Sequence, residues 1–115
     1  MRVVGFEHVQ LAMPAGRETE ARAFYDGLLG IPERVKPPEL AKRGGCWFER
    51  GPLKLHLGVE PEFRPARKAH PALVVEGLPA LRAALEKAGH RISTDAELVD
   101  FERTSSTIRS ATASS

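Results

Sequence analysis

Two stretches of this sequence decide the fold, because the second repeats the pattern of the first. Phe6-Glu7-His8-Val9-Gln10-Leu11-Ala12-Met13 alternates in the manner of a strand, and a helical pattern follows it. Ala69-His70-Pro71-Ala72-Leu73-Val74-Val75-Glu76 has the same character and is also followed by a helical pattern. Each stretch carries a histidine near its start. A repeat of this kind indicates two matched modules, and their histidines could serve one shared site.

The composition is typical of a single globular domain. A chain of 115 residues can bury a modest core, and 42% of its residues are hydrophobic. The formal net charge of +2 is too small to predict a nucleic-acid partner. Cys46 is the only cysteine, which excludes an internal disulfide and fits a reducing compartment. No stretch resembles a signal peptide or a membrane span, so we expect a cytoplasmic protein.

The periodicity predicts a strand, a helix and three further strands in the first module. We expect these elements over residues 2–13, 17–30, 33–36, 46–50 and 53–59, with the last two strands forming a hairpin. The second module follows with a strand over 69–76, a helix between Gly77 and Gly89, and weaker strands over 91–94 and 98–104. Module one therefore spans about 1–60, the connector 61–68, module two about 69–104, and a Ser/Thr-rich tail 105–115.

Three histidines share one property, which is their position opposite the aliphatic face of their strand. This holds for His8, His56 and His70. If the aliphatic faces pack on the helices, the three imidazoles project from the other side of the curled sheet. Neutral imidazole is a common ligand of divalent metals, and a catalytic ion needs about three protein ligands. A single strand histidine is more often a packed or solvated residue, so the prediction depends on the set of three.

The sequence resembles the vicinal-oxygen-chelate superfamily, which includes glyoxalases, bleomycin-resistance proteins, extradiol dioxygenases and fosfomycin-resistance enzymes. The resemblance is carried by FEHVQLAM with His8, the helix ARAFYDGLLGI, LKLHLGV with His56, and KAHPALVV with His70. It implies an α+β fold in which two βαβββ modules form an open, curled mixed sheet around a cleft. It also implies a divalent metal ion (Zn, Fe, Ni or Mn) held by these three histidines. A fourth ligand, usually a glutamate, lies in a closing stretch resembling D-P-F-G-N-x-I-E, which this chain lacks.

The tail departs from the family pattern. Residues 105–115 are almost entirely serine, threonine and alanine, which is also typical of a disordered terminus. One permissible codon string for this segment, read one base out of frame, gives F-Y-D-P-F-G-N-R-I-E. We therefore predict a one-base frame disruption near Thr104 or Ser105. The last strand of the second module would then be missing or altered, although serine and threonine tolerate a strand.

Four other residues are candidates for substrate contact. Gln10 points the same way as His8, and Trp47 lies on the face opposite Phe48, although ordinary packing explains Trp47 equally well. Arg64 and Arg67 precede His70 and could bind an acidic group by paired donors, while a solvated connector is the simpler interpretation. These four residues join the three histidines as the predicted site.

The predicted function is that of a glyoxalase- or dioxygenase-like protein. A metal-dependent lyase or dioxygenase would act on a small substrate with vicinal oxygens through the three histidines. Two alternatives remain open: a metal-free small-molecule binding protein of the resistance type, and an inactive truncated relative. The expected partners are a small-molecule substrate and, as in many relatives, a second copy in a homodimer, with no nucleic acid and no membrane.

Overall fold

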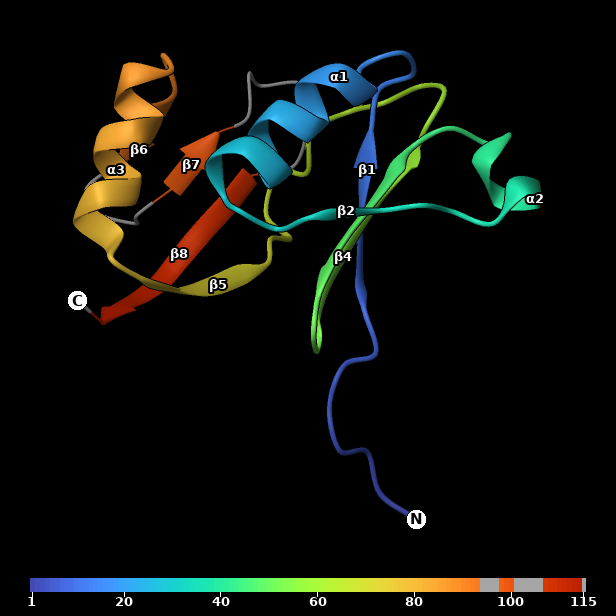
Figure 1. Cartoon of the computed structure of the whole chain (residues 1–115), viewed down its shortest axis with the longest axis horizontal. Coiled ribbons are helices and arrows are strands. Elements are labelled where there is room, and N and C mark those ends of the chain that lie inside the picture. Colours follow the sequence, from blue (N-terminus) through green and yellow to red (C-terminus); the bar gives the residue numbers. More distant parts are fainter. Residues whose placement is uncertain (94–97, 101–106, 115) are drawn as a thin grey trace.

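Two four-stranded sheets lie side by side, and each is accompanied by a helix from its own module (Figure 1). The computed structural model describes residues 1–93, 98–100 and 107–114, with side chains described through residue 90. The first module contains β1 (Val9–Met13), α1 (Glu18–Ala21), η1 (Arg22–Leu28), β2 (Glu33–Arg34), α2 (Pro38–Ala41), β3 (Cys46–Arg50) and β4 (Leu53–Val59). The second contains β5 (Ala72–Glu76), α3 (Leu78–Lys87), β6 (Arg91–Ser93), β7 (Leu98–Asp100) and β8 (Thr107–Ser114). The predicted α+β fold is confirmed.

The two sheets have the same topology. Their strand orders are β1-β4-β3-β2 and β5-β8-β7-β6, so the first and fourth strands of each module are parallel neighbours. β1 and β5 each form an open edge of their sheet. The internal repeat read from the sequence is therefore a repeat of structure.

The register of the first sheet separates apolar from polar side chains. Leu55 and Leu57 of β4 are buried on the same face as Phe48 of β3, where Phe24 and Tyr25 of η1 cover them. On the opposite face, His56 is paired in register with Gln10 on one side and with Trp47 on the other. The period of two in the strands thus directs the histidine side of this sheet away from the helix.

The first helix ends where the sequence predicted. η1 continues α1 as a π-helical segment, in which hydrogen bonds reach five residues back, as from the Leu29 amide to the Phe24 carbonyl. Gly30 then adopts a positive φ of 72°, and the Ile31 amide returns to the Tyr25 carbonyl. Glycine closes the helix because it enters the left-handed region without a Cβ penalty.

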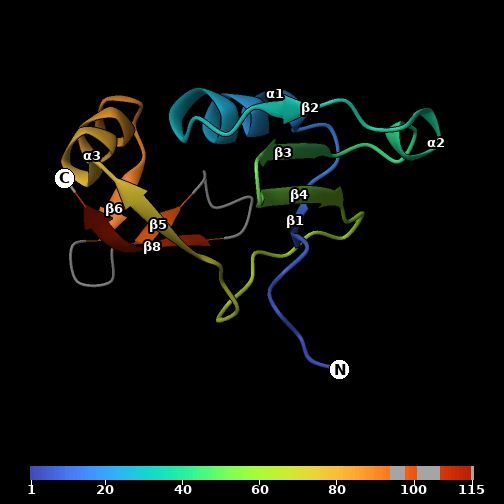
Figure 2. The same ribbon diagram turned by 60° about the horizontal axis from the view of Figure 1, so that its bottom comes forward.

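Three details differ from the sequence prediction. β1 and β5 are shorter than predicted, since their regular pairing begins at Val9 and Ala72, so His8 and His70 precede their strands. Residues 1–5 extend away from the body as an exposed arm (Figure 2). α2 forms in a segment that was expected to be a loop, because Pro38 supplies a φ suited to a first helical turn. The last strand is present: its backbone pairs with β5 and β7, so the strand is altered in sequence and not missing.

Two remaining observations concern the limits of the described chain. The end of the strand predicted over 98–104 and the predicted frame-disruption point lie outside the described residues. Among the helices that are described, none is long and apolar enough to cross a membrane.

Candidate functional site

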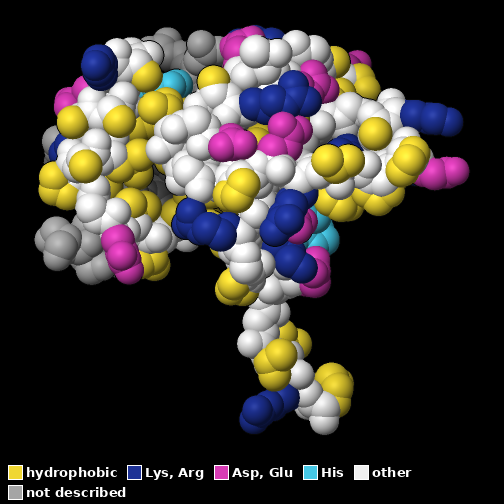
Figure 3. All heavy atoms as spheres, viewed as in Figure 1, with side chains coloured by type: hydrophobic (Ala, Val, Ile, Leu, Met, Phe, Trp, Pro, Cys, Tyr) yellow, Lys and Arg dark blue, Asp and Glu magenta, His cyan; other side chains and the backbone are white. Residues whose placement is uncertain are grey.

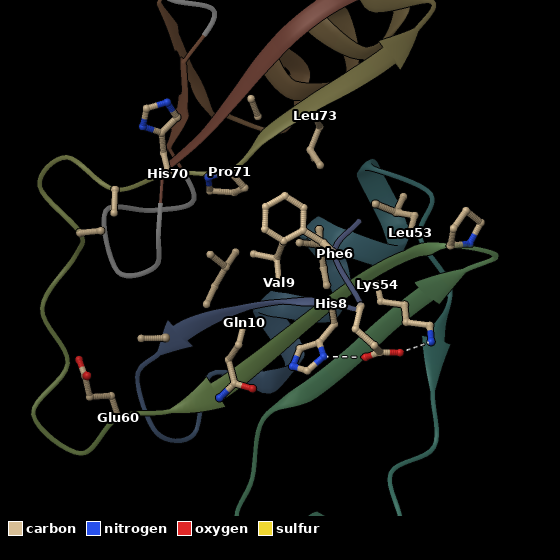
Figure 4. A pocket seen from close by; sticks show the side chains of 18 of the residues that line it. Phe6, His8, Val9, Gln10, Leu53, Lys54, Glu60, His70, Pro71 and Leu73 are labelled. Atoms are coloured by element: carbon tan, nitrogen blue, oxygen red, sulfur yellow. Dashed lines mark hydrogen bonds and ion pairs between the residues drawn. The ribbon is translucent and has the colours of Figure 1, made fainter. Parts of the chain in front are cut away.

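Two adjoining pockets open on the histidine side of the first sheet. The larger, of about 810 Å³, is lined by residues of β1 and β4, by the connector and by β5, and so draws on both modules. The smaller, of about 700 Å³, is lined by the first module alone, including Trp47 and His56. His8 and Gln10 line both pockets. Figure 4 shows the larger pocket, with His70 and Leu73 across it from His8 and Gln10.

His8 is held by a chain of charged groups at the wall between the pockets. Its Nδ1 lies 2.7 Å from Glu7 Oε1, and Lys54 Nζ donates to Glu7 Oε2 at 2.7 Å, as the dashed lines in Figure 4 mark. The hydrogen bond and charge of Lys54, with the hydrogen bond of His8, lower the pKa of Glu7 to about 2. Glu7 is therefore an anion at neutral pH. In the neutral tautomer of His8 that donates its Nδ1 proton to this carboxylate, the Nε2 lone pair is available to a ligand.

His56 is the most enclosed of the three histidines. Only 6% of it is exposed, and its Nε2 lies 2.6 Å from Glu49 Oε2. Its ring is stacked on Trp47 at a centroid distance of 4.3 Å and on His8 at 4.4 Å. The three rings form a column that crosses from β3 through β4 to the start of β1. The pair with Glu49 satisfies the buried imidazole, as a buried polar group requires.

His70 stands apart from this column. It precedes β5, is exposed, and makes a hydrogen bond from its Nδ1 to the Lys68 carbonyl oxygen at 2.8 Å. It lines the larger pocket only. The structure thus brings His8 and His56 together and leaves His70 on the opposite side of a cavity.

The predicted metal site was tested against this arrangement. The chemistry of the three side chains suits a divalent ion. Each histidine forms a hydrogen bond with an oxygen through one ring nitrogen, which is the usual arrangement in histidines that bind a metal through the other nitrogen. Their positions do not suit it, because the near-parallel rings of His8 and His56 cannot aim their lone pairs at one point. Within the described part of the chain, no group of three or more His, Cys, Asp or Glu side chains is placed to hold an ion. The three-histidine centre therefore stays a prediction.

Three of the four predicted substrate-contact residues line a pocket. Gln10 lines both pockets, Trp47 lines the smaller, and Arg64 lines the larger. Arg67 is exposed and lines neither. Trp47 is also packed against His56, so its two interpretations are compatible.

Several side chains of the site were not singled out from the sequence. Glu7 and Lys54 orient His8, while Lys36 and Arg43 enter the smaller pocket from the segment around α2. Glu7 and Lys54 could have been found from the sequence, because Glu7 directly precedes His8 and Lys54 lies two residues before His56. Nothing in the sequence pointed to Lys36 and Arg43, because the path of the segment around α2 depends on tertiary packing.

Cys46 is not part of this site. It is completely buried, and burial raises the pKa of its thiol to about 11. At neutral pH it is therefore a protonated, apolar core residue.

Solved structures of known proteins share the fold. The crystal structure of a protein from Bacillus anthracis, described as a "putative glyoxalase family protein", is 39% identical to this chain, with a TM-score of 0.80, and the match covers 96% of this chain and 97% of that one. A structure described as a "possible Glyoxalase" from Bacillus cereus is 16% identical, with a TM-score of 0.70 and coverage of 94% and 98%. The fosfomycin resistance protein FosX from Listeria monocytogenes is 12% identical, with a TM-score of 0.67 and coverage of 94% and 91%. The last two show likeness of fold alone. No protein-family model and no curated protein matches the chain.

Proposed function

The chain belongs to the glyoxalase family of the vicinal-oxygen-chelate superfamily, and on this premise we propose that it binds a small molecule in the larger pocket. The observation that carries the proposal is that this cavity of about 810 Å³ is lined by both modules. Its walls combine apolar side chains, such as Val9 and Leu73, with a few polar ones, such as His8 and Arg64. Ligand sites of small molecules have this character.

His8 is the residue best supported for contact with the ligand. Glu7 fixes its Nδ1, so Nε2 is available to accept a hydrogen bond or a proton from a bound hydroxyl group. Arg64 could bind an anionic or carbonyl oxygen on the same ligand. A substrate with neighbouring oxygens would suit these two groups, and this supports a binding protein that could also move a proton.

Isothermal titration calorimetry can test the proposal. The probes are fosfomycin, a catechol and an α-hydroxy ketone, chosen because each carries neighbouring oxygens. His8→Gln and Arg64→Gln should each weaken the strongest binder by about ten-fold, the loss of one strong hydrogen bond. Arg67→Gln is the control, because Arg67 is exposed and lines neither pocket. If the control weakens binding as much as His8→Gln does, the pocket assignment is wrong.

A metal-dependent lyase or dioxygenase is the second candidate. It is favoured by His8 and His70, which precede the first strands of the two modules and line the same pocket. In each of them Nδ1 forms a hydrogen bond with an oxygen, as is usual for histidines that bind a metal through the other ring nitrogen. Metal analysis of the purified protein should find about one equivalent, reduced by His8→Ala and by His70→Ala. Protein without stoichiometric metal after incubation with Zn²⁺, Fe²⁺, Ni²⁺ or Mn²⁺ would remove this candidate.

We also propose that the protein forms a homodimer through its N-terminal arm. Met1, Val3 and Val4 are among the most exposed large hydrophobic residues, and Figure 3 shows hydrophobic side chains along the arm. The arm leads into the open edge strand β1 (Figure 1). Apolar side chains beside an open strand edge favour association with another chain. Light scattering should give twice the chain mass, and deletion of residues 1–5 should give the monomer mass. A monomer before deletion would refute the dimer.

A further inference from the structure

The smaller pocket has a feature that the proposed function does not use, which is its aromatic floor. Trp47 and His56 are cross-strand neighbours of β3 and β4, and their rings are stacked with an interplanar angle of only 10°. His56 has His8 on its other side, so Trp47 ends the column. Trp47 is only partly buried and lines the pocket. A flat ring placed in the pocket could extend the column on this indole.

The charges around this floor are unequal. Both carboxylates of the pocket are occupied, Glu7 by His8 and Lys54 and Glu49 by His56. Two cations, Lys36 and Arg43, also line the pocket, and neither forms an ion pair with any described residue. Lys36 donates to the Gly44 carbonyl, which fixes its ammonium group at the pocket wall. Glu18 lies near enough to Lys36 to offset part of its charge, so Arg43 is the cation of the pocket with the least compensation beside the stacking surface.

We propose that the smaller pocket binds a planar aromatic anion, such as an aryl carboxylate, with its ring on Trp47 and its carboxylate at Arg43 and Lys36. Stacking supplies contact area for a flat ring, and a guanidinium group binds a carboxylate through two parallel hydrogen bonds. The inference goes beyond the proposed function, because none of Lys36, Arg43 and Trp47 lines the larger pocket. Since His8 lines both pockets, an aromatic anion would lie next to a ligand of the larger one.

The shape and charge of the ligand can be tested with three small probes. 2-Naphthoate is flat and anionic, 2-naphthamide is flat and neutral, and cyclohexanecarboxylate is anionic without an aromatic ring. Trp47 is the only tryptophan, so its fluorescence reports on this pocket alone. We expect 2-naphthoate to change that fluorescence saturably and to bind about ten-fold or more tightly than either other probe. Equal binding of all three, or no saturable binding of 2-naphthoate, would overturn the proposal.

Substitutions then locate the binding by calorimetry. Arg43→Gln should weaken 2-naphthoate binding about ten-fold, whereas its exposed neighbour Lys42, which lines neither pocket, provides the matched control Lys42→Gln. Trp47→Leu should weaken binding and Trp47→Phe should retain most of it. If Arg43→Gln and Lys42→Gln behave alike, the proposal fails. Arg64 lines only the larger pocket, so Arg64→Gln tests the proposed function separately. If Arg64→Gln does not weaken binding of the probes with neighbouring oxygens, the proposed function fails, whereas the proposal for the smaller pocket is unaffected.

Discussion

Glu49 and His56 form the most enclosed polar pair of the site, with 2.6 Å between Oε2 and Nε2. They lie on adjacent antiparallel strands, two residues apart in register, on the face opposite the core. The position of His56 between two other rings depends on this contact. Burial removes water from the imidazole, and without a hydrogen-bond partner in the protein this would cost free energy.

Removal of the Glu49 carboxylate should destabilise the protein. Glu49→Ala leaves the buried His56 nitrogen without its acceptor, at a cost of roughly 1–3 kcal/mol in the free energy of unfolding. Glu49→Gln keeps an acceptor and should cost less. Urea unfolding measures both, with the exposed connector residue Glu62→Ala as control. A loss no larger than that of the control would mean that the pair does not stabilise His56.

Glycine is required at position 45 for two independent reasons. Gly45 has φ of 85°, and a Cβ there would lie 2.1 Å from the Leu57 carbonyl oxygen. Gly45→Ala should therefore cost about 3 kcal/mol or more, or prevent folding. Gly51→Ala is the control, because it has φ of 59° with nothing within 4 Å and should cost only about 1 kcal/mol. Similar losses at the two positions in urea unfolding would contradict the close contact.

Glu18 should contribute to acid sensitivity. A hydrogen bond from the Gly45 amide lowers the pKa of Glu18 below its ordinary value of 4.5. As the pH falls, the unfolded chain therefore binds a proton at Glu18 before the folded chain does. The stabilisation that the Glu18 carboxylate gives the folded protein is present above pH 4.5 and is lost as the pH falls below it. Glu18→Gln should flatten the pH dependence of the unfolding free energy between about pH 5 and 3. An unchanged slope would show that this carboxylate is not involved.

The thiol of Cys46 should be unreactive in the folded protein. Its side chain is buried and burial raises its pKa to about 11, so almost no thiolate is present at pH 8. Ellman's reagent should react with less than one tenth of the protein within the time that the urea-unfolded chain needs to react completely. Rapid reaction of the native protein would instead reveal frequent opening of the core.

The tail prediction is settled at the nucleotide level. Sequencing of the gene should place a one-base change near Thr104 or Ser105, after which the other frame encodes F-Y-D-P-F-G-N-R-I-E. A chain with the frame restored should bind a divalent ion about ten-fold or more tightly, since a carboxylate is added to the donors. Competition with a chelator compares the two chains. Codons that are incompatible with the other frame would refute this origin.

The alternation of residues in the strands determined much of the fold. It gave β3 and β4 their bounds and put His56 opposite the leucines of its strand, because the side-chain period of a strand is fixed by its backbone. Gly30 and Gly89, both at positive φ, mark the ends of their helices in the sequence and in the structure. The internal repeat could be recognised in the sequence because the same alternation of residues occurs at the start of both modules.

Only the tertiary structure decided which histidines meet. His8 reaches His56 because β1 and β4 are parallel neighbours, whereas His70 precedes a strand of the other sheet. The position of the second sheet depends on packing between the helices, where the Phe24 and His90 rings lie 5.1 Å apart. Local periodicity fixes the face on which a side chain lies, but the distance between two modules is set by contacts that are remote in sequence. The sequence therefore placed His56 opposite the leucines of its strand, and packing determined which other histidine meets it.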